Sequence, residues 1–199
     1  MSEPSGDAAV PLRFDLQDLV RRSVATLYSH LVTRPTGRAL RLGIESQIEE
    51  LGSLCLSILD FRQVVVLDYS CADETVAKLL QRFLADDRPA DAYFLARGVG
   101  ETHLEPLEEV LLRHRLALVA ELETGDVTLL GAADETERAA WAALEALGRA
   151  GPDDVARCLG LAPAVVAPAL EALAGRRLVV RRRGAPVYLA LTALLAEDA

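Results

Sequence analysis

Between residues 56 and 130 the hydrophobic positions follow two alternating patterns. Short apolar runs rich in β-branched side chains, several of them closed by an acid, predict buried strands. The predicted strands are residues 56–61, 64–68, 91–96, 116–122 and 127–130. Residues 73–85 and 102–115 instead carry apolar side chains at helical spacing. Strands that alternate with helices predict an α/β domain built on a largely parallel sheet.

The N-terminal part is expected to begin with a flexible tail at residues 1–12, followed by a helix that starts near Asp15. The apolar residues with helical spacing in this helix are Leu16, Leu19, Val20, Val24, Leu27 and Leu31. Segment 33–37 contains Pro and Gly and interrupts the pattern. A partly alternating segment at residues 38–44 then predicts a strand, and residues 46–54 predict a short helix.

From residue 134 the chain becomes rich in Ala and Leu. The predicted elements here are helices at residues 137–149, 153–159 and 163–175 and a β-hairpin at residues 178–189. Three helices followed by a hairpin is the layout of a winged helix, a variant of the helix-turn-helix. The chain is therefore expected to hold an α/β domain at residues 13–132 and a small α+β, winged-helix-like domain at residues 134–199.

Composition and charge agree with two folded modules. Of the 199 residues, 51% are hydrophobic, which is enough for a sizeable core. Residues 138–199 hold eight Arg and six acidic residues, whereas residues 1–137 hold 13 basic and 24 acidic ones, so the two modules differ in charge. No run approaches the roughly 20 apolar residues of a membrane helix, and residues 1–10 do not resemble a signal peptide. We therefore expect a cytoplasmic protein without a membrane partner.

No constellation in the sequence predicts a catalytic centre, a metal site or a bound cofactor. The nucleotide-binding patterns G-x-G-x-x-G and G-x-x-x-x-G-K-[ST] and the nucleophile elbow G-x-S-x-G do not occur. The scattered cysteines and histidines, none at metal-ligand spacing, are Cys55, Cys71, Cys158, His30, His103 and His114. The sequence therefore predicts a protein that is not an enzyme.

The most informative segment runs from Asp60 to Glu74. One apolar run ends at Asp60, a short crossing follows, and a second run ends at Asp68, just before Ser70 at a predicted helix start. The four residues from Ser70 to Asp73 also fit the capping-box pattern, in which the serine hydroxyl accepts hydrogen bonds from the free N–H groups of the first helical turn. Capping alone would explain a serine at this position.

This segment resembles the STAS domains, the fold of bacterial anti-sigma-factor antagonists. In that family one strand ends in Asp-Leu, and a second strand runs into Asp-Ser-Ser-Gly before a helix. The matching residues are Asp60-Phe61 for the first element, Asp68-Tyr69-Ser70-Cys71 for the second, and Ala72-Asp73-Glu74 for the helix start of a divergent STAS-like branch. The resemblance covers residues 31–132 and implies a sheet flanked by helices. It also implies that Ser70 occupies the position of the serine that partner kinases phosphorylate.

The resemblance implies that this loop and helix start form the partner-binding surface, and it leaves two roles open for Ser70, a structural cap and a regulatory phosphosite. Tyr69 and Cys71 replace the family's first Ser and its Gly, which makes the loop bulkier. A phosphate on Ser70 would lie at a helix N-terminus, where the helix dipole favours an anion, but neighbouring acids would repel it. The expected partner-contact residues are Asp68, Tyr69, Ser70, Cys71, Asp73 and Glu74.

The winged-helix-like domain lacks the side chains that read DNA bases. Aligned on a recognition helix, residues 161–171 present Pro, Ala, Val and one Glu to the groove, and none of these makes the usual base contacts. This face indicates a protein contact, with the α/β domain, a twin subunit or a partner. The residues that keep DNA-phosphate contacts open are the basic strip Arg176, Arg177, Arg181, Arg182 and Arg183. A solvated basic wing, or pairing with the acidic first domain, explains the same strip.

Two functional hypotheses follow. In the first, the chain is a regulatory protein that binds a protein partner, such as an ATPase-kinase of the anti-sigma type, through the Ser70 loop. The winged helix then serves docking or homodimerisation. In the second, the chain is a DNA-binding transcriptional regulator with a STAS-like sensor domain.

Overall fold

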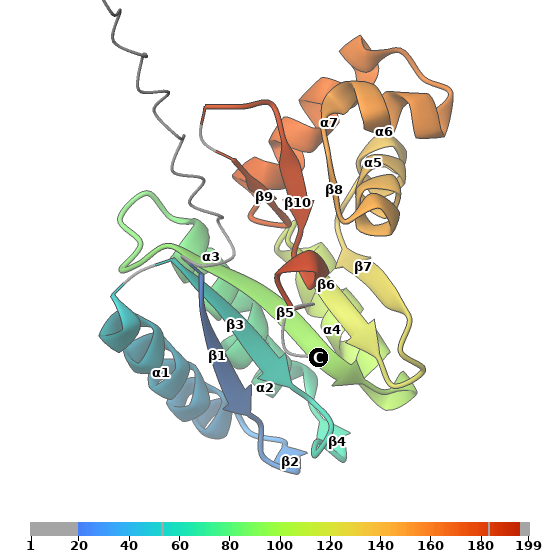
Figure 1. The fold of residues 1–199 in the computed structure, drawn as a ribbon. Coiled ribbons are helices and arrows are strands. Elements are labelled where there is room, and N and C mark those ends of the chain that lie inside the picture. Colours follow the sequence, from blue (N-terminus) through green and yellow to red (C-terminus); the bar gives the residue numbers. More distant parts are fainter. Residues whose placement is uncertain (1–19, 53, 183, 196–199) are drawn as a thin grey trace, which may run out of the picture.

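The computed structural model describes residues 20–52, 54–182 and 184–195, and its centre is a five-stranded sheet (Figure 1). Across the sheet the strands are, in order, β1 (Arg21–Thr26), β3 (Cys55–Asp60), β5 (Ala92–Val99), β6 (Ala117–Leu122) and β7 (Val127–Gly131). The first four strands are parallel, and β7 is antiparallel to β6. The predicted α/β class with a largely parallel sheet is therefore confirmed.

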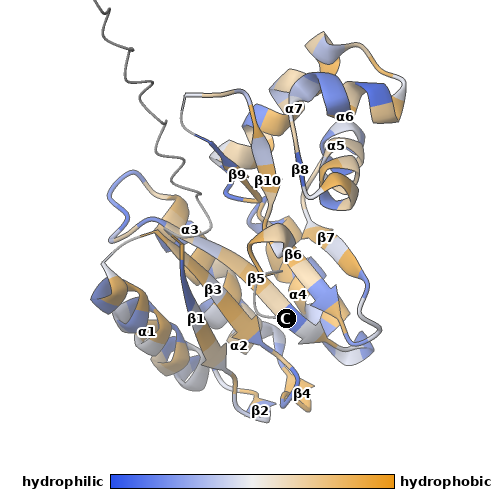
Figure 2. Cartoon of the chain, in the orientation of Figure 1, coloured by the Kyte–Doolittle hydropathy of each residue, from blue (hydrophilic) through white to orange (hydrophobic). Residues whose placement is uncertain are grey.

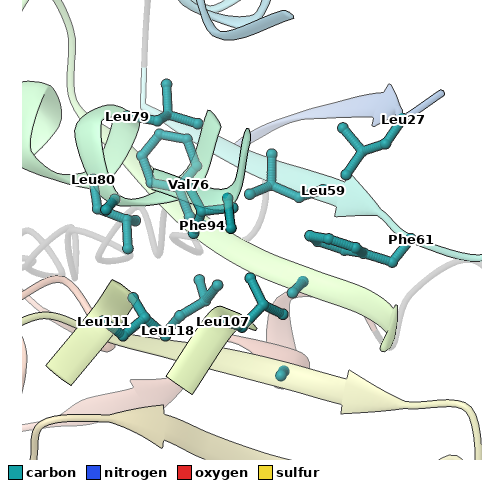
Figure 3. Packing of buried hydrophobic residues seen from close by; sticks show 14 of the residues in the cluster. Leu27, Leu59, Phe61, Val76, Leu79, Leu80, Phe94, Leu107, Leu111 and Leu118 are labelled. Carbon is teal, nitrogen blue, oxygen red and sulfur yellow. The ribbon is translucent and has the colours of Figure 1, made fainter. Parts of the chain in front are cut away.

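Helices connect the parallel strands and cover one face of the sheet. They are α1 (Arg34–Leu51) between β1 and β3, then α2 (Tyr69–Ala72), the π-helical turn η2 (Asp73–Ala77) and α3 (Lys78–Leu84) between β3 and β5, and α4 (Glu101–Arg113) between β5 and β6. Because crossovers between parallel strands are right-handed and these strands are neighbours in chain order, all the helices that connect them lie on one face. The main core forms between them and the sheet and includes Leu79, Phe94 and Leu107 (Figure 3).

A two-residue ribbon extends the fold beyond the carboxyl ends of β1 and β3. In it, β2 (His30–Leu31) pairs in parallel with β4 (Val66–Leu67). Buried His103 of α4 holds the turn that leads into β4: its Nδ1 accepts the Gly100 N–H at 3.0 Å, and its Nε2–H donates to the Val64 carbonyl at 2.9 Å. The position of the helix that follows β4 is therefore fixed from α4.

The opposite face of the central sheet is covered by residues 135–194, the C-terminal module (Figure 1). Its elements are α5 (Glu135–Leu147), β8 (Arg149–Ala150), α6 (Pro152–Leu159), α7 (Pro163–Gly175), β9 (Val179–Arg181), β10 (Tyr188–Ala190) and the 3-10 turn η3 (Thr192–Leu194). The three strands form an antiparallel sheet in the order β8-β10-β9. Alternate residues of a strand face opposite ways, so Leu56, Ile58 and Val119 point to this side and form a second core with Trp141 and Leu170.

Two arginines at the end of α7 reinforce the contact between the modules. The guanidinium of Arg177 donates to Asp91 at 2.5 Å and to the Ala92 carbonyl at 3.1 Å, and it lies 5.3 Å from the ring centroid of Tyr93. Arg176 donates to the Ala132 carbonyl, in the segment that connects the two modules. The C-terminal module is thus joined to the sheet by an apolar core and by charge-assisted hydrogen bonds.

The central strands have the hydropathy expected of a sheet that is covered on both faces. All six residues of β3 are buried, and apolar residues predominate along β3 and β5 (Figure 2). Within the described part of the chain, no single helix has the length and apolar composition needed to cross a membrane. The helices α6 and α7 together have that length and apolar composition, but the pair is bent by 117°.

The predicted N-terminal helix is wrong over the residues that the structure describes. Residues 21–31 form β1, a turn and β2 instead. The inward face of β1 carries only Ser23 and Ala25, so the strand lacks a conspicuous apolar alternation, and the spacing of its other apolar residues imitates a helix. Residues 13–19 and the predicted tail at residues 1–12 lie outside the described residues.

The predicted strand at residues 38–44 is also wrong, because these residues belong to the helix α1. The predicted helix at residues 46–54 is confirmed over residues 46–51, which are the last part of this longer helix. Thr33 caps the helix by accepting the Thr36 N–H at 3.3 Å, and Pro35 fits the first turn, where a backbone N–H needs no intrahelical partner. The predicted strand at residues 64–68 contributes only β4, in the ribbon rather than the main sheet. The remaining predicted elements are confirmed with shifted ends.

Replacing Arg177 with Met should lower the free energy of unfolding by about 1–3 kcal/mol, because Asp91 and the Ala92 carbonyl lose a charge-assisted donor. Urea denaturation followed by the fluorescence of Trp141 measures this change. Arg181→Met is the matched control: its ion pair with Glu171 is exposed on both sides, so we expect a change below about 0.5 kcal/mol. Equal effects of the two substitutions would contradict the interface assigned to Arg177.

Candidate functional site

The candidate site lies where β4 runs into the helix formed by α2, η2 and α3. The ribbon fixes Asp68 at this junction, because the Asp68 N–H donates to the Leu31 carbonyl at 2.8 Å. The Asp68 side chain then accepts the Ser70 N–H at 2.7 Å and caps the helix. Hydrogen bonds from the Ser70 hydroxyl and amide lower the pKa of Asp68, so this carboxylate stays ionised at the helix N-terminus.

The prediction that Ser70 is the helix cap is therefore wrong. The helix begins at Tyr69, and Ser70 is its second residue, whose N–H is one of the free donors that a cap has to satisfy. Asp68 lies before the first helical residue in extended conformation, which is the backbone geometry that a cap requires. The capping-box pattern matched Ser70, but the chain enters the helix two residues earlier, and Ser70 remains half-exposed.

The predicted partner-contact residues divide into two groups. Asp68, Tyr69 and Ser70 are half-exposed at the helix start. The residues that are buried, contrary to expectation, are Cys71, Asp73 and Glu74. Residues 71–77 are all buried, because this part of the helix is held between α1 and α4. Burial raises the pKa of the Cys71 thiol, and a hydrogen bond to Glu105 raises the pKa of Tyr69.

Asp73 joins three helices through charged hydrogen bonds. Its carboxylate accepts a hydrogen bond from Arg34, the first residue of α1, at 3.2 Å. It accepts a second from His114, the C-cap of α4, at 2.6 Å. Burial acts to raise the pKa of Asp73, but the hydrogen bonds from His114 and Arg34 outweigh it and lower this pKa. The helix start is thereby tied both to α1 and to α4.

Glu74 belongs to the same buried network. Its carboxylate accepts Lys78 from the next turn and Arg34 from α1, the latter at 3.2 Å. The hydrogen bond from Lys78 is the largest influence on the pKa of Glu74, and together with Arg34 it outweighs burial and lowers that pKa. Both acids lie in η2, and a π-helical turn within a helix is often found at functional positions.

Gly37 lets α1 approach the helix start very closely. A Cβ atom at this position would lie 2.9 Å from the Cys71 carbonyl oxygen, closer than real Cβ atoms come, and 3.0 Å from the Glu74 Cβ, which is a very tight contact. The Gly37 carbonyl also accepts the Thr75 hydroxyl at 3.3 Å. The local sequence pattern favours an interruption at this glycine, and nothing in it indicates a helix-to-helix contact.

Three exposed valines lie on the ribbon, next to the half-exposed helix start. Val65 and Val66 are 64% and 42% exposed on the ribbon, and Val32, which follows β2, is 46% exposed. Their positions are fixed because the N–H groups of Val65 and Val66 both donate to the Ser29 carbonyl, at 2.8 and 3.1 Å. We call the set Val32, Arg34, Val65, Val66, Asp68, Tyr69 and Ser70 the Ser70 surface. Contiguous exposed apolar groups rimmed by polar ones are typical of a protein contact.

The predicted basic strip does not form one surface. Arg176 and Arg177 lie in the contacts with the connecting segment and the sheet described above, and Arg176 also pairs with Glu137 at 3.0 Å. Arg181 pairs with Glu171 at 3.2 Å, and the backbone N–H of Arg182 donates to the Val187 carbonyl. Arg183 lies outside the described residues.

Over residues 20–52, 54–182 and 184–195, no three His, Cys, Asp or Glu side chains gather as metal ligands. A scan of protein-family models, a search of curated proteins and a search of solved structures each returned no match.

Gly37→Ala should destabilise the fold by about 1–3 kcal/mol, because the added methyl group has no room between α1 and α2. Gly175→Ala is the matched control, since Gly175 ends α7 and a Cβ there meets no atom within 4 Å. Thermal and urea unfolding compare the two variants. A Gly37→Ala protein as stable as Gly175→Ala would contradict the close approach of the helices.

Asp73→Asn should cost about 1–3 kcal/mol of stability at pH 7, because His114 and Arg34 lose a charged acceptor. The folded-state pKa of Asp73 is lowered, so its contribution is fully present above the unfolded pKa of about 3.9 and is lost as the pH falls through the folded value. The difference from wild type, measured by urea unfolding between pH 7 and about 3, should therefore shrink on acidification. Asp86→Asn, at an exposed position, should show no such trend.

Proposed function

We propose that this protein is a STAS-like, non-enzymatic bacterial regulator that binds a protein partner through the Ser70 surface. The observation that carries the proposal is the group of exposed valines on the ribbon, next to a helix start that is held by hydrogen bonds but half-exposed. Asp68 caps this helix start, the Asp73 and Glu74 network holds it from below, and the ribbon fixes its valines. A surface held rigidly in this way loses little conformational entropy when a partner binds.

The fold supports the STAS-like assignment in three respects. The order of strands and helices places every crossover helix on one face of the sheet. Asp60 ends β3, where its carboxylate pairs with Arg62 at 2.5 Å. After a short crossing Asp68 precedes a helix, as the family pattern requires. For the C-terminal module, the order α5-β8-α6-α7-β9-β10 supports a winged-helix-like assignment.

In this proposal the partner is a kinase-type ATPase, as the resemblance to STAS domains implies, and Ser70 supplies a switch. Its hydroxyl lies in the first helical turn, where free N–H groups attract an anion. Asp68 already occupies these donors, so a phosphate on Ser70 would compete with Asp68. It would also add negative charge next to the exposed valines of the Ser70 surface. Arg34, whose side chain is 56% exposed, is the cation available to receive the phosphate. Phosphorylation would then release the partner.

The C-terminal module serves in this proposal as a cover for the sheet rather than as a DNA reader, and the protein acts in the cytoplasm. The exposed side of α7 carries Val165 and Pro168, and the exposed Leu161 lies just before this helix; none of the three side chains donates a hydrogen bond to a base edge. Arg176 and Arg177, which were candidates for phosphate contacts, are occupied inside the protein. The transcription-factor alternative therefore has less support than contact-based regulation.

The test is quantitative co-purification of the full-length protein from its native host, followed by mass spectrometry. Val66→Glu and Ser70→Glu should each reduce the recovery of the partner at least about tenfold, because each places a negative charge on the Ser70 surface. Ser70→Ala should retain the partner, and phosphorylated Ser70 should be found in the unbound fraction.

Val165→Glu provides the matched control, since Val165 is 47% exposed on α7, away from the Ser70 surface. If Val66→Glu recovers the same partners in the same amounts as Val165→Glu, the Ser70 surface is not where this protein binds.

A further inference from the structure

One glycine of α1 is not explained by packing. Gly43 lies in the interior of this 18-residue helix, where glycine is, after proline, the least favourable residue. A Cβ atom at Gly43 would meet no atom of the described chain within 4 Å, whereas a Cβ atom at Gly37 would press against α2. A close contact between helices therefore accounts for Gly37, while Gly43 leaves open space beside the helix.

The open space beside Gly43 belongs to a groove between α1 and the outer edge of β1. Its volume of about 440 Å³ lies within the range of roughly 300–1,000 Å³ that is usual for small-molecule sites. None of its lining residues is charged, and they include Val24, Thr26, Tyr28, Leu40, Gly43 and Gln47. The groove thus combines apolar walls with a few polar groups, as small-molecule sites do.

The β1 wall of the groove offers unpaired backbone groups. The Leu27 N–H donates inward, to the Asp60 carbonyl at 3.2 Å, and in a strand that pairs on one side only every second residue has this inward direction. Val24 and Thr26 are the alternate residues, so their N–H and C=O groups point away from the sheet. In the part of the chain that the structure describes, no group hydrogen-bonds to these outward groups.

The open stretch of backbone is too short for a β-strand of another protein. Val24 and Thr26 are two residues apart, which corresponds to roughly 6.6 Å along the strand. Arg22, the other outward residue of β1, is not free, and its guanidinium donates to the Leu194 carbonyl. A strand of the usual length, about five or six residues, would need the outward groups of all three residues. A stretch of two residues matches a single ring system instead.

We propose that this groove binds a flat, uncharged heteroaromatic molecule whose edge carries a hydrogen-bond donor beside an acceptor, as a lactam does. The edge pairs with the outward backbone groups of Val24 and Thr26, and the ring lies against α1 at Leu40 and Gly43. Tyr28, which is 65% exposed, offers its ring for stacking. The ligand is uncharged because the lining has no charge that would offset the desolvation of an ion.

This ligand site is independent of the proposed function. No residue that lines the groove belongs to the Ser70 surface, so the ligand site and the partner contact can each fail without the other. The two are connected by α1, which begins at Arg34 of the Ser70 surface and lines the groove further along its length.

The first experiment titrates carbostyril, a neutral bicyclic lactam, into the isotopically labelled full-length protein and follows the backbone amides by NMR. The amide signals of Val24 and Thr26 should shift in a saturable way, with a Kd of about 1 mM or lower. N-Methylcarbostyril, which lacks the donor, and quinaldate, which is charged, should each bind at least about tenfold more weakly. No saturable shift at these two amides up to about 10 mM carbostyril, or equal binding of all three compounds, would overturn the proposal.

The second experiment tests the location of the site with Gly43→Leu, which fills the groove. The leucine has free space and a better helix propensity than glycine, so urea unfolding should show a protein at least as stable as wild type. Carbostyril should bind this variant at least about tenfold more weakly. Ser46→Leu, at an exposed position of α1 outside the lining, is the matched control and should bind carbostyril like wild type.

Equal affinity of Gly43→Leu and Ser46→Leu for carbostyril would refute the location. Light scattering of the same proteins separates a ligand site from a contact between two copies of the chain. If wild type is a dimer and Gly43→Leu is a monomer, a second copy occupies the groove and the inference is wrong.

Discussion

The constraint on which the structure depends is that a parallel sheet has to be buried on both faces. The chain visits β1, β3, β5 and β6 in spatial order, and right-handed crossovers place all the connecting helices on one side. The other side still carries Leu56, Ile58 and Val119, which have to be removed from water. The C-terminal module covers these residues. The two modules that the composition suggested therefore share the burial of one sheet.

The sequence predicted the fold best where local pattern and tertiary environment agree. The strand at residues 56–61 was found because burial on both faces leaves a continuous apolar run, and the helix at residues 163–175 because Pro163 and Gly175 mark its two ends. The secondary structure before β3 was mispredicted because the residues that determine it there are small or polar rather than apolar. Ser23 and Ala25 fill the inward face of an edge strand, and Gly37 serves a close contact with a segment more than 30 residues away.

At the candidate site the sequence indicated the right segment but not the role of each residue. The constellation from Asp60 to Ser70 does mark a helix start, yet which residue caps it depends on where the ribbon delivers the chain, through the bond from Asp68 to Leu31. The burial of Asp73 and Glu74 depends on partners in α1 and α4, which no local pattern could connect. The exposed valines were missed because an apolar run was taken for a buried strand.

The shared burial of the sheet also sets an order of events during synthesis. The ribosome releases β3, β5 and β6 before β10, whose Tyr188 and Leu189 belong to the second core. Until the last residues emerge, one apolar face of the nascent sheet stays exposed to solvent and prone to aggregation, and a chaperone would have to shield it. The same dependence makes the α/β part a poor unit for genetic shuffling, because a copy moved without its C-terminal cover would carry that bare face with it.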